Sequence, residues 1–341
     1  MQRARRGNLI VESAQPKSVQ ETNDMTSRSN FFDNAHFLVR CLRYRYRTER
    51  LQIKTMMALQ LKGATVLDIG ANKGIYCFWM MRAVGPSGRV IAFEPQPEMR
   101  YGIERQKRRF NWSNLRVMNV ALSDLDGEMR LSRQRIGDGS ATLELPRRRS
   151  EDETLNVQVT KLDTIADEIF SNLKFMKCDV EGHEHNVFLG AEQTIRRYRP
   201  VVQFESTVTD ERTQDIFQFF RGLGYSGVLL LGNTYLHYSN PERVPHYKFG
   251  MGGHRDFLFF PPEAIGTTIP LSMSRQFPLT ATAASMSSLI GQSGKSWDRQ
   301  AVEDLVMQYR IERARRWTGK IGLLIFALAA VAAVISLFSR K

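Results

Sequence analysis

A glycine-rich turn lies between an acid-bearing apolar run and a second apolar segment in the first quarter of the chain. The apolar run 64–69 contains Asp68, and the turn that follows contains Gly70, Asn72 and Gly74. This order predicts a strand, a tight turn and a helix. Glycine permits positive φ and lets a ligand approach the backbone, and the first N–H groups of the helix point into the same space. A nucleotide-like ligand is typical of such a site.

The next apolar run, 88–95, contains Glu94 at about the position where an acid accepts both hydroxyls of a ribose. A dinucleotide site has the spacing G-x-G-x-x-G, whereas this turn has G-x-N-x-G, which disfavours an NAD enzyme. Two acids suit a ligand that carries an ammonium group and hydroxyls but no phosphate. S-adenosylmethionine has these features, so we predict it as the cofactor, bound by Asp68, Gly70, Asn72, Gly74 and Glu94. The alternative is an ordinary strand, turn and helix with incidental acids.

More acids and a histidine follow two later apolar runs. The run 173–180 predicts a buried strand with an acid near its carboxyl end, and the run 200–205 predicts another. In an open parallel sheet, ligands bind beyond the carboxyl ends of the strands, so these side chains should share an edge with the cofactor. Carboxylates and imidazoles are common general bases. The candidate catalytic residues at this edge are Asp179, Glu181, His183 and Glu205.

The segment 179–185 has two other interpretations. Its acids and its two histidines, His183 and His185, offer oxygen and nitrogen ligands for a divalent metal. The spacing lacks the rigidity of a ligand motif, and we predict no metal. The second alternative is structural: the acids of the segment could cap the next helix, because negative charge is favourable near a helix N-terminus.

Six segments between about residues 66 and 261 resemble one known family. They are VLDIGANKGIYCFWM, GRVIAFEPQPE, NLRVMNVALSDLDGEMRL, KLDTIAD, FMKCDVEGHEHNVFLGAEQTI and RPVVQFES. Together they look like the FkbM-type S-adenosylmethionine-dependent methyltransferases, and DVEGHE is the most family-specific piece. The resemblance implies an α/β fold of the Rossmann-like class I methyltransferase type. Such a fold has a seven-stranded, mostly parallel sheet with an antiparallel edge strand.

The same resemblance implies residue roles and a reaction. In this family the turn after the third strand, expected here over 115–122, lies beside the adenine. This adds Val120 and Ala121 to the expected cofactor contacts, together with Asp179. The family mostly methylates oxygen, so we expect the acceptor to be a hydroxyl, whose proton must pass to a general base. We favour Asp179 or Glu181 as this base, with His183 as the alternative.

Composition restricts the partners. The 341 residues carry a net charge of +13, and 42% of them are hydrophobic, enough for a full core. No recognisable nucleic-acid-binding module accompanies the basic runs, so we expect no nucleic-acid partner. The three cysteines form no CxxC pair, which argues against a disulfide framework and a zinc site.

The chain outside the catalytic domain has a distinct organisation. We predict a disordered basic arm (1–30), the methyltransferase domain (31–262), a linker (263–298), a basic amphipathic helix (299–320) and an apolar run (321–338). That run is about 18 residues long, near the minimum for crossing a hydrocarbon core of roughly 30 Å. More positive charge precedes it than follows it, so we predict a single-pass C-terminal membrane anchor with the catalytic domain cytoplasmic. A buried helix of the soluble fold is the alternative.

The leading hypothesis is therefore an S-adenosylmethionine-dependent methyltransferase. Its acceptor is expected to be a small-molecule, glycan or lipid-linked hydroxyl at a membrane. A nucleic-acid methyltransferase is suggested only by the charge, and the aromatic-proline motif usual for base methylation is replaced here by Asp-Val-Glu-Gly at 179–182. A third possibility is a non-catalytic, membrane-tethered binding module on the same fold. The intact acids and glycines of the predicted cofactor site argue against it.

Overall fold

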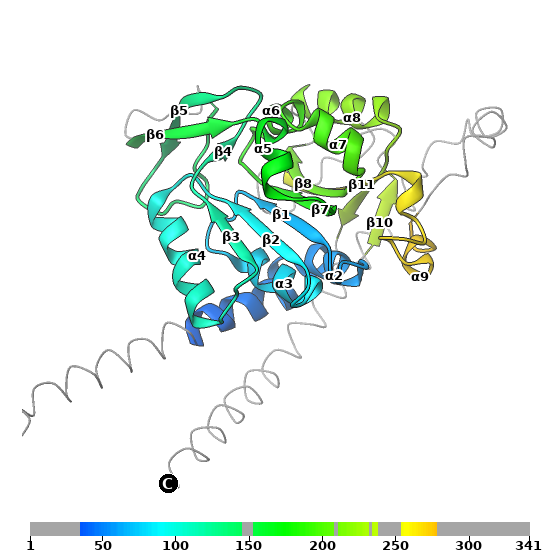
Figure 1. The fold of residues 1–341 in the computed structure, drawn as a ribbon. Helices are drawn as coiled ribbons and strands as arrows, with labels where there is room; N and C mark the ends of the chain where they lie inside the picture. Colours follow the sequence, from blue (N-terminus) through cyan, green and yellow to red (C-terminus); the bar gives the residue numbers. More distant parts are fainter. Residues whose placement is uncertain (1–34, 145–152, 208–210, 232–233, 238–253, 278–341) are drawn as a thin grey trace, which may run out of the picture. The chain divides into compact units, whose positions relative to one another are not determined.

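The computed structural model describes residues 35–144, 153–207, 211–231, 234–237 and 254–277. Within them, eight strands form a central sheet in the order β10-β9-β11-β8-β7-β1-β2-β3 (Figure 1). The strands are β1 (Thr65–Ile69), β2 (Arg89–Phe93), β3 (Leu115–Met118), β7 (Leu173–Cys178), β8 (Val201–Thr207), β9 (Ser226–Leu231), β10 (Thr234–His237) and β11 (His254–Phe260).

Five neighbouring strands of this sheet, β8, β7, β1, β2 and β3, are parallel. Antiparallel β11 lies between β8 and β9, and β10 adds a further antiparallel strand beyond β9. The mostly parallel sheet is as predicted. It has one strand more than the expected seven among the described residues, and β11 lies inside the sheet, because β9 pairs with β11 and forms a hairpin with β10.

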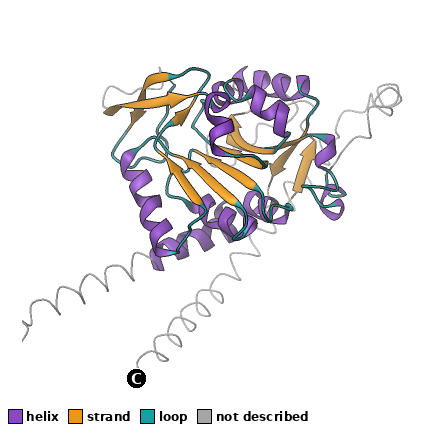
Figure 2. Ribbon diagram, in the orientation of Figure 1, coloured by secondary structure: helices purple, strands orange, loops and turns teal. Residues whose placement is uncertain are grey.

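Helices cover both faces of the central sheet (Figure 2). One face, with Leu67, Ile91, Met176 and Phe204, forms a continuous hydrophobic core with the helices of the second half of the domain. The opposite face packs on helices of the first half. The helices on the first face are α5 (Leu162–Ile169), α6 (Glu184–Leu189), α7 (Glu192–Tyr198) and α8 (Glu211–Gly222), and those of the first half are α2 (Arg50–Ala58), α3 (Ile75–Val84) and α4 (Pro97–Arg109).

A second sheet of three strands stands beside the first, in the order β4-β6-β5. Its strands are β4 (Ala121–Leu122), β5 (Gly127–Arg133) and β6 (Glu153–Thr160). The single strand expected over 115–122 is thus divided into β3 and β4. Between them, Asn119 Nδ2 donates to the carbonyls of Glu94 and Pro95, at 2.9 and 2.8 Å. This pair of bonds holds the break against the end of β2.

The compact unit continues past the predicted domain end at residue 262. It includes α9 (Leu271–Ser274) and ends at Phe277. Ile269, Met273 and Phe277 are buried, and the Phe277 ring contacts Tyr235 and Phe260. The domain extends beyond residue 262 because these three apolar residues of a Ser- and Thr-rich segment pack at the edge of the core.

The other predicted segments lie outside the described residues. They are the arm 1–30, the linker beyond 277, the amphipathic helix 299–320 and the membrane anchor 321–338. Among the described residues, no helix combines the length and the apolar character needed to cross a bilayer.

Candidate active site

The glycine turn is held between the ends of three neighbouring strands. Gly70 has φ of +76°, and its N–H donates to the carbonyl of Phe93 at the end of β2 at 3.0 Å. On the other side, the N–H of Asp179 donates to the carbonyl of Ile69 at 3.0 Å. A Cβ on Gly70 would lie 1.9 Å from the carbonyl oxygen of Asp179. Glycine is therefore required at this position both by its φ and by the close approach of the chain after β7.

A cleft opens beside this turn, at the carboxyl ends of β1, β2 and β7. Three carboxylate residues line it, Glu94, Asp179 and Glu181, and no lysine or arginine of the described residues does. Phosphate recognition relies on cations and N–H donors, so this lining favours a ligand without phosphate. The other lining residues are Ile69, Gly70, Asn72, Phe93, Pro95, Gln96, Ala121, Leu122, Leu131, Gly139, Ala141, Leu143 and Val180.

Glu94 follows β2 and is 3% exposed. Its Oε2 accepts the N–H of Asn72 at 2.7 Å, and its Oε1 accepts the N–H of Gln96 at 2.9 Å. Burial raises the pKa of Glu94 to about 7, against the lowering effect of these two hydrogen bonds. Each oxygen keeps a second acceptor direction. Glu94 therefore lies where the sequence predicted, with capacity for hydroxyl donors in the cleft.

Asp179 and Glu181 line the cleft from the loop that follows β7. Lys177 Nζ, on β7, donates to Asp179 Oδ2 at 2.8 Å. Burial opposes the charge of Lys177, but Asp179, Asp68 and Glu49 outweigh that effect and raise the pKa of Lys177. The ammonium group therefore orients the Asp179 carboxylate beside the cleft. This lysine was not predicted as a site residue, because it lies inside an apolar run.

Asp68 does not line the cleft, in contrast to its predicted role. It is fully buried in β1, where its Oδ2 accepts the thiol of Cys77 of α3 at 3.1 Å. Its Oδ1 has no hydrogen-bond partner within the described residues. Burial raises the pKa of Asp68, while Lys177 opposes the rise. The reason is strand alternation: the next residue, Ile69, lines the cleft, so the Asp68 side chain points to the opposite face of the sheet.

His183 is also placed outside the cleft. It is 2% exposed, with Nε2 at 2.9 Å from Ser123 Oγ and Nδ1 at 2.7 Å from Glu144 Oε1. Both ring nitrogens are thus engaged in joining three separate loops. The neighbouring Glu184 accepts two backbone N–H groups of the turn before it, at 3.0 and 3.2 Å. These contacts favour the structural interpretation of His183 and Glu184.

Glu205 lies on β8, in register with Asp256 of β11. It does not line the cleft, but the charges of the lining residues Asp179 and Glu181 act on its carboxyl group. Burial, with Asp179, Asp256 and Glu181, raises the pKa of Glu205 to about 9. Burial also raises the pKa of Asp256 to about 7, with Glu49 adding to the rise. At neutral pH Glu205 therefore retains its proton.

The remaining predicted cofactor residues divide into two groups. Asn72, with φ of +51°, and Ala121 line the cleft. Val120 instead packs against the hydrophobic core, partly buried. Gly74 has φ of +73° before α3, and a Cβ there would lie 3.2 Å from Ile103 Cγ1 of α4. The structure thus explains Gly74 by its backbone conformation and helix packing.

The loop 134–144 covers one side of the cleft, and its Gly- and Ser-containing sequence allowed either a pocket-shaping loop or a surface insert. It contributes Gly139, Ala141 and Leu143 to the lining. Asp138 fixes its first part: its Oδ2 accepts the N–H of Gln134 and its Oδ1 that of Ser140, both at 3.1 Å. The contacts that anchor the loop were not predicted, because Gln96 and Glu98, which hold it, are distant along the chain.

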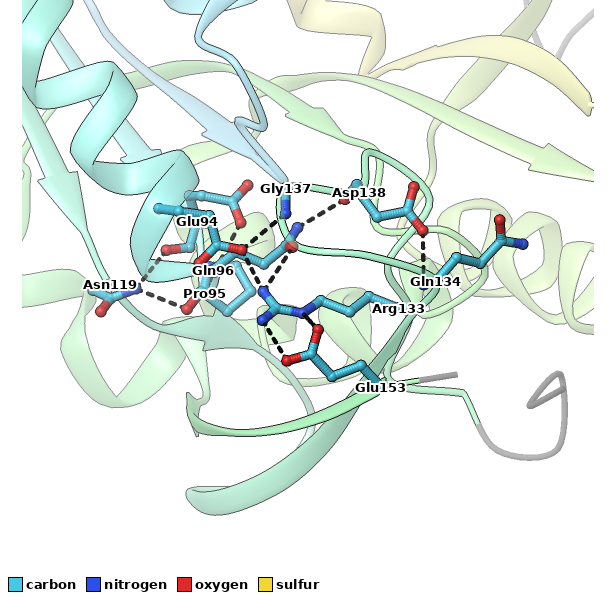
Figure 3. Close-up of polar contacts among 10 residues, drawn as sticks. Glu94, Pro95, Gln96, Asn119, Arg133, Gln134, Gly137, Asp138 and Glu153 are labelled. Atoms are coloured by element: carbon cyan, nitrogen blue, oxygen red, sulfur yellow. Dashed lines mark hydrogen bonds and ion pairs between the residues drawn. The ribbon is translucent and has the colours of Figure 1, made fainter. Parts of the chain in front are cut away.

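Arg133, at the end of β5, fixes this loop to the turn after β2 (Figure 3). It is 6% exposed and forms ion pairs with Glu98 and with Glu153, the latter at 3.1 Å. Its Nη1 also donates to Gln96 Oε1 at 3.4 Å, and Gln96 Nε2 donates to the carbonyl of Asp138 at 2.9 Å. One buried guanidinium thus connects β5, β6, α4 and the loop that covers the cleft.

Metal ligation finds no support in the described part of the chain. No group of three or more His, Cys, Asp or Glu side chains there is arranged to hold a metal ion. His183, one of the ligands considered from the sequence, faces Ser123 and Glu144.

Comparison with known proteins identifies the domain. Residues 68–226 match the model of the methyltransferase FkbM domain. No curated protein matches this chain. Similar solved structures include methyltransferase FkbM from Methylobacillus flagellatus KT, at 16% sequence identity and a TM-score of 0.38. That alignment covers 58% of this chain and 43% of the other, so this chain spans less than half of that protein.

Two further solved structures show a similar level of likeness. Precorrin-6y C5,15-methyltransferase from Geobacter metallireducens GS-15 has 13% identity and a TM-score of 0.35, over 61% of this chain and 85% of that one. Fibrillarin from Aeropyrum pernix, with natively bound S-adenosyl-L-methionine, has 12% identity and a TM-score of 0.37, over 63% and 74%.

Proposed function

We propose that this chain, an S-adenosylmethionine-dependent methyltransferase with an FkbM domain, methylates a hydroxyl group of its acceptor. One observation carries the cofactor assignment: the cleft beyond β1, β2 and β7 is lined by three carboxylate residues and, within the described residues, by no lysine or arginine. S-adenosylmethionine carries an ammonium group, a sulfonium and a ribose diol, and it has no phosphate. The charge of the lining therefore matches that of the ligand.

The residues of the cleft divide the binding task. Glu94 would accept the ribose hydroxyls, because both of its oxygens are already fixed by backbone N–H groups and keep further acceptor capacity. Asp179 and Glu181 place negative charge on the other side of the glycine turn, where an ammonium group is favoured. Gly70 lets the chain that carries Asp179 and Glu181 approach the turn closely. When bound, the cofactor supplies an electrophilic methyl carbon.

Asp179 is the general base of this proposal. It lines the cleft, and Lys177 holds one of its oxygens at 2.8 Å. Glu205 is the weaker candidate, because a pKa raised to about 9 leaves it protonated at neutral pH. His183 is weaker still, since both ring nitrogens are engaged away from the cleft. Asp179 would accept the proton of the acceptor hydroxyl as the oxygen attacks in line.

The acceptor is proposed to be a small-molecule, glycan or lipid-linked hydroxyl compound at a membrane. The support is the apolar run 321–338 of the sequence, flanked by Lys320 and by Arg340. We propose that this run anchors the protein with its catalytic domain in the cytoplasm. Extraction of membranes with carbonate tests the anchor, and release of the protein into the supernatant would contradict it.

Calorimetric titration of the full chain with S-adenosylmethionine tests the cofactor assignment. Methyl-labelled profiling of metabolites and lipids, with and without the protein, then identifies the acceptor. With that acceptor, Asp179→Asn should lower turnover by about 10²-fold or more. The matched control is Asp167→Asn, an exposed acid of α5, which should retain full turnover. Full turnover by Asp179→Asn would remove Asp179 as the base, and absence of cofactor binding would contradict the function itself.

A further inference from the structure

A second pocket lies between the helix at residues 35–43 and α4, and its lining shares no residue with the cofactor cleft. It adjoins the cofactor cleft along the chain, since Lys73 lines the pocket and the preceding residue, Asn72, lines the cleft. A ligand bound in this pocket would therefore lie beside the glycine turn.

The pocket is strongly basic. Arg40, Lys73 and Arg105 line it, and the acid among its lining residues is Glu98. Glu98 is already engaged, because its Oε1 pairs with Arg133, which it shares with Glu153, and accepts the N–H of Gly137. Burial lowers the pKa of Lys73, the charges of Arg40 and Arg135 lower it further, and the charge of Asp138 opposes them. These like charges repel one another, and an anion bound among them would relieve the repulsion.

Two uncharged features indicate that the pocket is built for a ligand. Gln106 is 6% exposed and lines the pocket, yet its Oε1 has no hydrogen-bond partner in the described residues. A buried acceptor of this kind costs free energy unless a donor reaches it. Gly102 lies inside α4, where glycine is less favourable than alanine. A Cβ at Gly102 would meet no atom within 4 Å, so packing does not require glycine there.

We infer that this pocket binds a phosphate or pyrophosphate group of the methyl acceptor, with Arg40 and Lys73 as its principal contacts. This inference rests on the proposed function where it identifies the ligand as the methyl acceptor. The binding of phosphate is argued from the residues of the pocket alone. Arginine forms paired N–H bonds with phosphate oxygens, and lysine adds a point charge. Gln106 would accept a hydroxyl or a protonated oxygen of the same ligand. The acceptor is thus a phosphorylated compound that also carries a hydroxyl.

Titration calorimetry of the full chain with pyrophosphate tests the inference, at low ionic strength. Gly102→Glu places a carboxylate in the open space of the pocket and should weaken pyrophosphate binding at least tenfold. The matched control is Gly222→Glu, because Gly222 is also a helical glycine at which an added Cβ would meet no atom within 4 Å. Arg40→Met should likewise weaken binding at least tenfold, and Arg196→Met, at an exposed position of α7, should not.

The same samples are titrated with S-adenosylmethionine. If the cofactor binds but pyrophosphate does not, or if Gly102→Glu and Gly222→Glu bind pyrophosphate equally, the phosphate pocket is refuted and the proposed function is unaffected. If pyrophosphate binds as expected but S-adenosylmethionine does not, the proposed function fails and the pocket remains. Two further titrations, with soluble dihexanoyl phosphatidic acid and with inorganic phosphate, distinguish a lipid phosphate from a soluble phosphate ester. Binding at least tenfold tighter than inorganic phosphate assigns the group to a lipid, and equal affinity assigns it to a soluble ester.

Discussion

The backbone N–H of Asn72 lies 2.7 Å from Oε2 of Glu94. This hydrogen bond joins the turn after β1 to the acid that follows β2, so the two halves of the cofactor cleft form one unit. Gln96 occupies the other oxygen of the same carboxylate at 2.9 Å. A change at Glu94 therefore alters the backbone of both loops as well as the charge of the cleft.

Glu94→Gln should weaken S-adenosylmethionine binding at least tenfold, or about 1.4 kcal/mol. The amide keeps one acceptor oxygen but presents an NH₂ group to one of two backbone N–H donors. Because burial raises the pKa of Glu94 to about 7, wild-type affinity should also rise between pH 6 and pH 8, as the carboxylate ionises. Calorimetry at both pH values measures the two effects.

Glu192→Gln, at a partly exposed position on α7, is the control for this substitution and should bind like the wild type at both pH values. An unchanged dissociation constant in Glu94→Gln, or a pH dependence that persists in it, would show that Glu94 does not bind the cofactor.

Gly70→Ala should destabilise the domain by roughly 3 kcal/mol or more. The new methyl group would overlap the carbonyl oxygen of Asp179 at 1.9 Å, and both atoms belong to backbone held at strand ends. Gly224→Ala is the matched control: Gly224 has φ of +72°, close to the +76° of Gly70, but a Cβ there meets nothing within 4 Å. The control should lose only the cost of positive φ, about 1 kcal/mol. Urea unfolding compares the two, and equal losses would show that the contact with Asp179 is unimportant.

His183→Asn should reduce stability and leave the chemistry intact. It removes the link between Ser123 and Glu144 and leaves buried polar groups unpaired, at a cost of about 2 kcal/mol. The shape of the pH profile of methyl transfer should be the same as in the wild type. His185→Asn, which lies two residues away on α6, is the control and should be close to wild type in both measurements. If His183→Asn removed the acidic limb of the profile, His183 would be the base after all.

The local pattern of the sequence predicted the elements that frame the cleft. Apolar runs gave β1, β2, β7 and β8, and the glycine spacing gave the turn between β1 and α3. These signals are strong because a strand buried on both faces must be apolar throughout. The direction of Asp68 was not accessible in the same way, because a shift of one residue in the facing pattern moves a side chain to the other side of the sheet.

Contacts between segments that are distant along the chain could not be predicted from the sequence either. Asp163 lies in the first turn of α5, where an acid is typical, yet its carboxylate accepts the N–H groups of Gln193 and Thr194 at the start of α7. His183 shows the same effect, since its partners come from two other loops. Residue type indicates what a side chain can bind, but only the topology decides which partner reaches it.

Stability should fall as the pH rises from about 5 to about 9. The folded-state pKa of Glu205 is raised to about 9, above its ordinary value of 4.5, so the folded state holds the extra proton. The stability that this proton contributes is complete below the unfolded pKa and is lost as the pH rises through the folded pKa. The pKa of Asp256, raised to about 7, acts in the same direction.

Glu205→Gln should therefore reduce the loss of melting temperature between pH 5 and pH 9, because the amide cannot ionise. Glu168→Gln, at an exposed acid of α5, should retain the wild-type slope. Differential scanning calorimetry in buffers of equal ionic strength gives the slopes. A wild-type melting temperature that rises over this range would contradict the assignment of the proton to Glu205.

Arg133→Met should weaken both the fold and the cofactor site. Glu98 and Glu153 would lose their buried partner, and breaking a buried ion pair by removing one member costs about 3 kcal/mol. Gln96, which donates to the carbonyl of Asp138 in the loop 134–144, would lose its contact with Arg133. The loop would then be held less firmly beside the cleft, so S-adenosylmethionine affinity should fall as well. Arg197→Met is the comparison, because Arg197 pairs with Asp167 at the surface, with 62% and 77% of the two side chains exposed. Exposed pairs contribute under about 1 kcal/mol.

Arg133→Lys separates charge from geometry, since lysine keeps the charge but cannot reach Glu98, Glu153 and Gln96 together. It should recover part of the stability while cofactor affinity stays low, and full recovery of affinity would mean that the charge alone positions the loop.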